Sequence, residues 1–270
     1  MKEYILKLNL YQPFAHYREP KVMQDDYIPT LNIPSPTTIA GMVSYVADKK
    51  FDSPFNIGVC CKYKTKDIHF IRGEDSEFYS KYLKQKKKKR LSYIDYKFTK
   101  SNRIMNFEVL QDVELTIFLK INNREDFELI KKSFENPKRY LVLGRKEDFV
   151  VKNKNANKIV EDITEKIKVI NIKNKPMAIK NKYKIKNTYV PVDLQDRDYD
   201  SNNDEILRSG VLYDIPSIYK DIKADKTNRE LSHSNYVYID NSGYYPSKGE
   251  FLLYEDQMIL YNWLVKDVIN

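Results

Sequence analysis

The sequence predicts an α+β fold, because strand-like and helix-like patterns of apolar residues alternate along the first half of the chain. Residues 3–11 alternate as a half-buried strand does, with Leu6, Leu8 and Leu10 on one face. Residues 37–49 carry one apolar stripe at helical spacing, as expected of a helix that packs on a sheet. Residues 107–121 have the longest alternating pattern in the chain and predict a long strand.

The other elements of the first half complete a recognisable order. A strand or hairpin is predicted at 57–72, and a helix with Phe127, Ile130 and Phe134 on one side at 124–136. Pro137 ends this helix, and residues 139–143 are predicted to return as a strand. The resulting β-α-β-β-α-β order is the ferredoxin-like (RRM-like) arrangement, which occurs in many RNA-binding sheets.

The second half of the chain predicts smaller, β-rich structure. A Lys/Asn-rich connection with a short helical piece near 157–168 comes first. Short strands are then predicted in KNTYVPVDL, GVLYDIPSIY, SHSNYVYI and EFLLYE. The acidic residues 193–205 are expected to form a solvated loop. We therefore divide the chain into a ferredoxin-like RNA-binding domain at 1–150 and a β-rich C-terminal region at 151–270.

Composition limits the class of protein. The chain has 270 residues, 41% of them hydrophobic, which is enough for a substantial core. No membrane-spanning stretch and no signal-peptide pattern occur in the sequence, so we expect a cytoplasmic location. The adjacent Cys60 and Cys61 lie in a predicted strand and point to opposite faces, so no disulfide is expected. Because the chain has only three histidines, we expect no metal site. Because it has no Gly-rich motif of the kind that binds phosphates, we expect no cofactor.

Positive charge is clustered in two segments. Residues 79–106 contain ten Lys and Arg residues against Asp95 alone, a net charge of +9. Residues 152–186 contain eleven lysines against three carboxylates, a net charge of +8. Since the whole chain has a net charge of +9, the remainder is acidic. Clustering of this kind predicts contact with a polyanion.

Candidate RNA-binding residues fall in three places. The loop at 12–36 is too long for an ordinary βα connection and is rich in rings and cations. With the end of the preceding strand, it supplies Tyr11, His16, Tyr17, Arg18 and Lys21. A basic run flanked by aromatic residues supplies Lys84, Lys86, Lys87, Lys88, Lys89 and Arg90. Gly144 permits a positive φ and a close approach of the backbone, and the cationic side chains of Arg145 and Lys146 directly after it could bind a phosphate. The alternative is a tight hairpin with a charged tip.

Two other functions remain open from the residues alone. One is a metal-independent endoribonuclease, with His16 or His69 and a nearby lysine as proton-transfer groups. His69 alternates with apolar neighbours in a strand and is expected to be structural, and His16 is expected to stack on a base rather than transfer a proton. The other is a structural assembly subunit, whose basic segments dock on acidic faces of partner proteins.

Taken together, these segments resemble the Cas-five family of CRISPR-associated proteins (RAMP superfamily), in the form found in type I-B and related Cascade complexes. The matching segments, in order over nearly the whole chain, are YQPFAHYREP, IPSPTTIAGMVSYV, DVELTIFL, LGRKEDFV, TYVPVDL, GVLYDIPSIY and NRELSHSNYVYI.

The resemblance implies a non-catalytic subunit that caps one end of Cascade and binds the 5′ handle of the CRISPR RNA. Residues 74–106 would be its thumb, beside the first guide nucleotides and near target DNA. The implied protein partners are the Cas-seven backbone subunits and the Cas-eight large subunit. In the type I-C branch, a tyrosine and a Lys-His pair cut precursor RNA. This sequence has no Lys-His pair, so processing by a separate Cas-six nuclease is implied.

Overall fold

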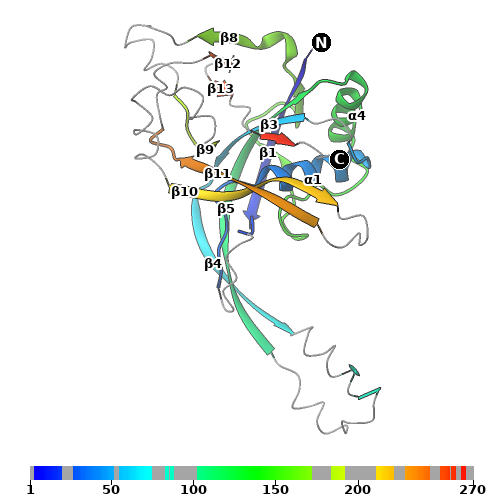
Figure 1. The fold of residues 1–270 in the computed structure, drawn as a ribbon, viewed down its shortest axis with the longest axis vertical. Helices are drawn as coiled ribbons and strands as arrows, with labels where there is room; N and C mark the ends of the chain where they lie inside the picture. The colour runs from blue at the N-terminus through cyan, green and yellow to red at the C-terminus, as the bar shows by residue number, and fades with distance from the viewer. Residues whose placement is uncertain are drawn as a thin grey trace.

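The computed structural model contains a large, mainly antiparallel sheet with two helices on one face, and two small sheets beside it (Figure 1). The residues that the structure describes are 3–19, 27–51, 55–74, 83–84, 86–87, 102–171, 184–191, 211–221, 229–243, 250–255, 257–259 and 263–265.

The large sheet consists of β1 (Tyr4–Ala15), β2 (Tyr27–Ile28), β3 (Phe55–Lys62), β4 (Thr65–Glu74), β5 (Asn102–Ile121), β6 (Val151–Lys152), β7 (Val160–Asp162) and β14 (Trp263–Val265). One small sheet consists of β9 (Thr188–Pro191), β10 (Val211–Asp221) and β11 (Arg229–Ile239), and the other of β8 (Lys168–Asn171), β12 (Glu250–Tyr254) and β13 (Gln257–Ile259). The helical elements are α1 (Pro36–Ala47), α4 (Arg124–Glu135) and the 3-10 turn η1 (Thr164–Lys166).

Strand β5 is the centre of the large sheet. It pairs antiparallel with β1 on one side and with β3 on the other, and β1 pairs antiparallel in turn with β6 and β7. Three strands of this sheet (β6, β7 and β14) come from beyond residue 150, so the second half of the chain completes a sheet begun by the first.

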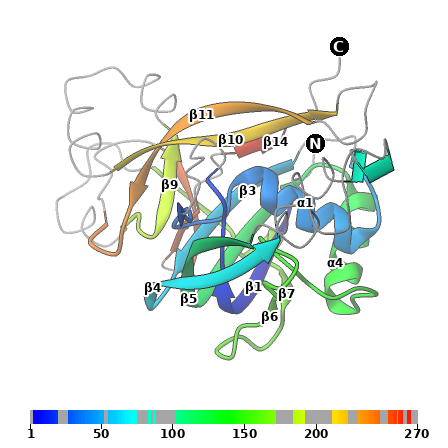
Figure 2. The same cartoon turned by 90° about the horizontal axis from the view of Figure 1, so that it is seen from below.

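The main core lies between this sheet and the helices α1 and α4. Leu8 and Ile117 face each other across β1 and β5, and both are fully buried in one cluster with Ile39, Val43 and Phe127. Burying a side chain of this size stabilises the fold by roughly 1.5–3 kcal/mol. The C-terminal strands share this cluster, and β10 lies against α1 (Figure 2).

Local sequence signals explain the ends of both helices. The Ser35 side chain accepts a hydrogen bond from the Thr38 amide at the start of α1, and Pro36 occupies its first turn. Asp48 ends α1 in the left-handed conformation. Helix α4 begins with an Asn123 cap and places Glu125 in its first turn, where a negative charge is favourable. The predictions of an opening strand, these two helices and a long strand at 107–121 are confirmed.

Two predicted elements are wrong. Residues 139–143 form no strand; only Val142 pairs, in an isolated bridge to Phe149, because residues 141–150 fold back on themselves through backbone hydrogen bonds. Of the short helical piece predicted near 157–168, only the turn η1 is present. Residues 160–162 form the strand β7 instead, because the open edge of β1 offers unpaired backbone groups there.

A two-stranded ribbon, β4 with residues 102–111 of β5, projects from the body of the protein (Figure 1). Strands β3 and β4 follow one unbroken register along β5, and the chain bends between them at residues 63–64. Opposite the bend, Asp112 adopts a φ of 52°, which is uncommon for a non-glycine residue. The Tyr11 hydroxyl donates to Asp112 Oδ1 at 2.7 Å and holds this position.

Of the predicted thumb at 74–106, the ribbon contains residue 74 and residues 102–106, and it begins earlier, at Thr65. Residues 75–82, 85 and 88–101 lie outside the described residues. Cys60 and Cys61 form no disulfide, as predicted. In the ranges given above, no helix has the length and apolar character needed to cross a membrane.

Candidate nucleic-acid interface

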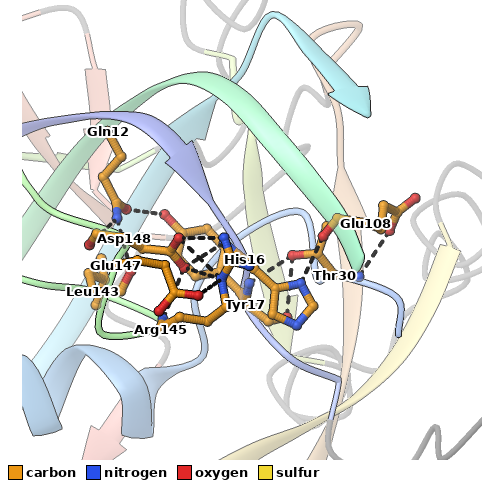
Figure 3. Close-up of polar contacts among 9 residues, drawn as sticks. All are labelled: Gln12, His16, Tyr17, Thr30, Glu108, Leu143, Arg145, Glu147 and Asp148. Carbon is orange, nitrogen blue, oxygen red and sulfur yellow. Dashed lines mark hydrogen bonds and ion pairs between the residues drawn. The ribbon is translucent and has the colours of Figure 1, made fainter. Parts of the chain in front are cut away.

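The loop at residues 143–148 is anchored to the end of β1 by the carboxylate of Asp148 (Figure 3). This side chain is 1% exposed and accepts hydrogen bonds from the backbone N–H groups of His16, at 3.0 Å, and Arg145, at 2.9 Å. The Arg145 guanidinium completes its shell, with Nη2 2.8 Å from Oδ1 and Nε 3.1 Å from Oδ2. Asp148 therefore fixes both the loop and the Arg145 side chain.

A second buried network connects the same loop to the segment after β1. The Gln12 amide donates to the carbonyl oxygens of Leu143, at 2.9 Å, and Asp148, at 3.1 Å. The Tyr17 hydroxyl donates to Gln12 Oε1 at 2.5 Å, and burial raises the pKa of Tyr17 well above its ordinary value. Tyr17 is thus a neutral donor inside the protein.

His16 lies between these networks and the ribbon. Its Nδ1 is 2.8 Å from the Glu108 carbonyl oxygen, and its ring packs edge-on against Phe107. Burial lowers the pKa of His16, Arg145 and Arg18 lower it further, and the hydrogen bond to Glu108 and the charge of Asp148 oppose them. The imidazole is therefore neutral at pH 7, with Nδ1 as the donor to Glu108.

The structure places the predicted RNA-binding residues in three different environments. The rings of His16 and Tyr17 are each 2% exposed, so in this structure neither ring is open to a stacking base, and both belong to the contacts that hold the loop. The Tyr11 hydroxyl is engaged by Asp112. The exposed ones are Arg18, Lys84, Lys86, Lys87 and Lys146. Lys21, Lys88, Lys89 and Arg90 lie outside the described residues.

Arg145 is less available to a phosphate than its sequence context predicts. Burial alone would lower its pKa, but the hydrogen bonds and charge of Asp148, with the charge of Glu147, raise it. The guanidinium also lies 5.7 Å from the centre of the Phe107 ring, within cation–π range. Arg145 therefore positions this corner, and the exposed neighbour Lys146 offers the accessible charge.

Exposed apolar side chains on the ribbon were not among the predicted site residues. Phe70 is 64% exposed, and Ile68 and Ile104 are also exposed. Ile68 and Phe70 alternate along β4, and Ile104 lies opposite Arg72, so all three belong to one face of the ribbon. At its base, the exposed Phe14 packs edge-on against His69. The alternation in DIHFIRG was the available signal, but alternation alone does not tell a buried face from an exposed one.

Gly144 provides a test of how tightly the loop is packed. It has a φ of 104°, and a Cβ at this position would lie 2.7 Å from the His16 carbonyl oxygen and 2.9 Å from Asp148 Oδ2. We expect Gly144→Ala to lower the free energy of unfolding by about 2 kcal/mol, measured by urea denaturation. Gly41→Ala, in α1 with nothing within 4 Å of the new methyl, is the control and should raise it by about 0.5–1 kcal/mol. Equal changes in the free energy of unfolding for the two substitutions would contradict the tight packing of the loop around Gly144.

Comparisons with known proteins give structural matches only. No family model and no curated protein matches the chain. A chain of a "CRISPR RNA-guided surveillance complex" is 13% identical, with a TM-score of 0.44, covering 87% of this chain and 88% of that chain. A chain of the "Type III-B Cmr-beta bound to cognate target RNA and AMPPnP" is 11% identical, with a TM-score of 0.38 and coverages of 88% and 84%. A CRISPR protein from Archaeoglobus fulgidus is 10% identical, with a TM-score of 0.38 and coverages of 96% and 99%. These identities and TM-scores are too low to assign a function.

Proposed function

We propose that this chain is a non-catalytic RNA-binding subunit of a CRISPR-associated complex, of the Cas-five type, that binds the 5′ handle of the CRISPR RNA. The observation that carries the proposal is the ribbon. It extends beyond the body of the protein and exposes Phe70 among aliphatic side chains. In the sequence, the basic run at 84–90 lies between its two strands. The order of segments that resembles the Cas-five family supports the same function.

The chemistry of the ribbon suits a single strand of RNA. Proteins that bind single strands combine cations along the backbone with side chains on which unpaired bases stack. Lys84, Lys86 and Lys87 are exposed and lie, in the sequence, between the two strands of the ribbon. Arg18, which pairs with Thr30 beside Glu108, and Lys146, which follows Arg145 beside Phe107, are also exposed. An RNA strand following the ribbon would meet positive charge at both ends and an apolar face between them.

The arrangement of the strands agrees with a ferredoxin-like domain. The order β3-β5-β1-β7, with every neighbouring pair antiparallel, follows from a β-α-β-β-α-β chain in which α1 and α4 both cover one face. We propose that the ribbon is the thumb of this domain. By the same resemblance, the subunit would adjoin the Cas-seven backbone and the Cas-eight large subunit of a type I-B complex.

The burial of His16 is the reason for proposing a subunit without nuclease activity. A general base must approach the 2′-hydroxyl of the RNA to hydrogen-bond distance. The His16 ring is almost fully buried, and its Nδ1 is engaged by Glu108. His69 packs on Phe14. Intact repeat RNA after incubation in EDTA is the expected result, and a discrete cut would overturn this part of the proposal.

Phe70 is the residue on which the proposal is tested. We expect Phe70→Ala to weaken binding of a single-stranded handle RNA by about tenfold, because one base–aromatic stack is worth roughly 1–3 kcal/mol. Fluorescence anisotropy with a labelled oligonucleotide measures this affinity. Tyr140→Ala, which removes an exposed ring on the segment after α4, is the control and should leave affinity unchanged. An unchanged affinity for Phe70→Ala would remove the ribbon from the site.

A further inference from the structure

A row of three side chains, Tyr27, Asn106 and Phe70, crosses the exposed face of the ribbon. Strand β2 pairs parallel with β5 and places Tyr27 beside Asn106. On the other side of β5, strand β4 places Phe70 beside the same Asn106. Residues directly opposite each other in a sheet point to the same face, so two aromatic rings flank the Asn106 amide on the face that carries Ile68 and Ile104.

All three side chains of this row are accessible from solvent. Phe70 is 64% exposed, and Tyr27 and Asn106 are partly exposed. Within the ranges that the structure describes, the Asn106 side chain forms no hydrogen bond, so its N–H groups and its carbonyl oxygen are available to a ligand. The row therefore presents two flat apolar surfaces with a donor and an acceptor between them.

Glu108 holds Tyr27 in position beside Asn106. It lies two residues further along β5, on the same face, and its carboxylate accepts a hydrogen bond from the Thr30 amide at 2.9 Å (Figure 3). The ammonium group of Lys66 is 3.3 Å from the same carboxylate. Burial, the charge of Glu108 and a hydrogen bond to its carboxylate raise the pKa of Tyr27, so the hydroxyl is a neutral donor. The ring is thus placed before any ligand binds, which lowers the entropic cost of binding.

The spacing of the two rings suits a single base. Strands β2 and β4 are two interstrand spacings apart, roughly 10 Å. Stacked aromatic rings have centroids roughly 4.5–7 Å apart, so one flat base between Tyr27 and Phe70 can stack on both. The edge of that base then meets the Asn106 amide.

The Asn106 amide determines which base completes the site. An asparagine forms two hydrogen bonds with adenine, because its N–H donates to the ring nitrogen N7 and its carbonyl accepts from the N6 amine. Guanine presents two acceptors on the same edge and leaves the carbonyl of the asparagine unpaired.

We propose that the ribbon recognises one unpaired adenine of the bound RNA, stacked between Phe70 and Tyr27 and hydrogen-bonded to Asn106. This specificity rests on the proposed function, which brings a single strand to the ribbon. Phosphate contacts carry no sequence information. The lysines between the ribbon strands therefore supply affinity, and the row of Tyr27, Asn106 and Phe70 supplies the preference for one base.

A short oligouridine, with or without one adenine in its middle, tests this preference with the full-length chain. Fluorescence anisotropy measures both affinities. We expect the oligonucleotide with adenine to bind about tenfold more tightly, because a bidentate contact to the correct base contributes a discrimination of this order. One guanine or cytosine in the same place should improve binding by no more than about threefold.

Substitutions in the row separate base recognition from general RNA binding. Asn106→Ala should abolish the preference for adenine and keep the affinity for plain oligouridine within about twofold. Tyr27→Leu should weaken binding of the adenine oligonucleotide by about tenfold, whereas Tyr27→Phe keeps the ring and should lose less than about threefold. Asn122→Ala, which removes an exposed amide directly after the other end of β5, is the control and should change neither affinity. The ratio of the two affinities does not depend on the fraction of folded protein, so a less stable variant does not mimic lost specificity.

The outcomes distinguish this site from the proposed function. Equal affinities of the natural chain for the two oligonucleotides, or a preference for adenine that survives Asn106→Ala, would overturn the adenine site. Either result leaves the effect of Phe70→Ala on handle RNA, and with it the proposed function, as it stands. If the natural chain binds neither oligonucleotide and Phe70→Ala leaves the affinity for handle RNA unchanged, the proposed function fails and the adenine site fails with it.

Discussion

Replacing Asp148 with alanine is expected to lower the free energy of unfolding by about 3 kcal/mol. Removing one member of a buried ion pair typically costs 3–5 kcal/mol, because the partner is left without compensation. Here Arg145 can regain some water, since 18% of its side chain is exposed, which places the loss near the lower end of that range. The substitution also leaves the backbone N–H groups of His16 and Arg145 without their acceptor. Urea denaturation followed by far-UV circular dichroism measures the loss.

Glu147 is the matched control for Asp148. It is the preceding residue, carries the same charge and contacts the same Arg145 at 3.4 Å, but its side chain is 61% exposed. Exposed ion pairs contribute roughly 0–1 kcal/mol, so Glu147→Ala should change stability by no more than about 0.5 kcal/mol. Asp148→Asn should give an intermediate loss, because an amide oxygen in the position of Oδ2 can still accept both backbone hydrogen bonds, whereas the charge that faces Arg145 is removed. Equal losses at Asp148 and Glu147 would show that charge, not burial, governs this loop.

The central elements were predictable because their signals are local. The alternation of Leu6, Leu8 and Leu10 and the helical spacing of Ile39 and Val43 each reflect one face packed on a core. Such periodic patterns depend on neighbours in the sequence, and the structure places these residues in one cluster.

The loop at 143–148 was not predictable in this way, because its structure depends on residues far along the chain. LGRKED follows a run of apolar residues and therefore predicts the end of a strand. The conformation of the loop depends on the Asp148 carboxylate, which accepts a hydrogen bond from the backbone amide of His16, more than a hundred residues earlier. The same contacts bury His16 and Tyr17. Their rings were predicted to be exposed because a long polar loop usually lies on the surface.

Asn187 was not predictable for a related reason, because it follows a Lys-rich stretch and predicts nothing by itself. Its left-handed conformation depends on backbone hydrogen bonds to Cys61 of strand β3 and to the Asp240 carbonyl. The charge clusters, by contrast, were visible in the sequence, since charge density requires no knowledge of long-range contacts. The RNA that they are predicted to bind stays a prediction.

The largest effect on RNA binding is expected at the end of the ribbon, from substitution of Lys84, Lys86 and Lys87 together by glutamine. All three side chains are exposed, and glutamine preserves length and polarity while removing charge. Each phosphate contact on a single strand contributes roughly 0.7 to the slope of log affinity against log salt. If all three lysines contact phosphates, the slope should fall by about 2, which corresponds to roughly a hundredfold weaker binding at 0.1 M salt.

A variant of equal charge separates local contact from the general field of the protein. Lys131, Lys132 and Lys138, on or just after α4, are replaced by glutamine in this control. Removing three charges far from the RNA weakens only the long-range attraction, which 0.1 M salt screens over about 10 Å. It does not change the number of counterions that the RNA releases when it binds. The control should therefore keep the natural slope and lose less than about threefold in affinity. Parallel changes in both variants would mean that the ribbon attracts RNA through net charge alone. A reduced slope in the ribbon variant alone would place its lysines on the phosphates.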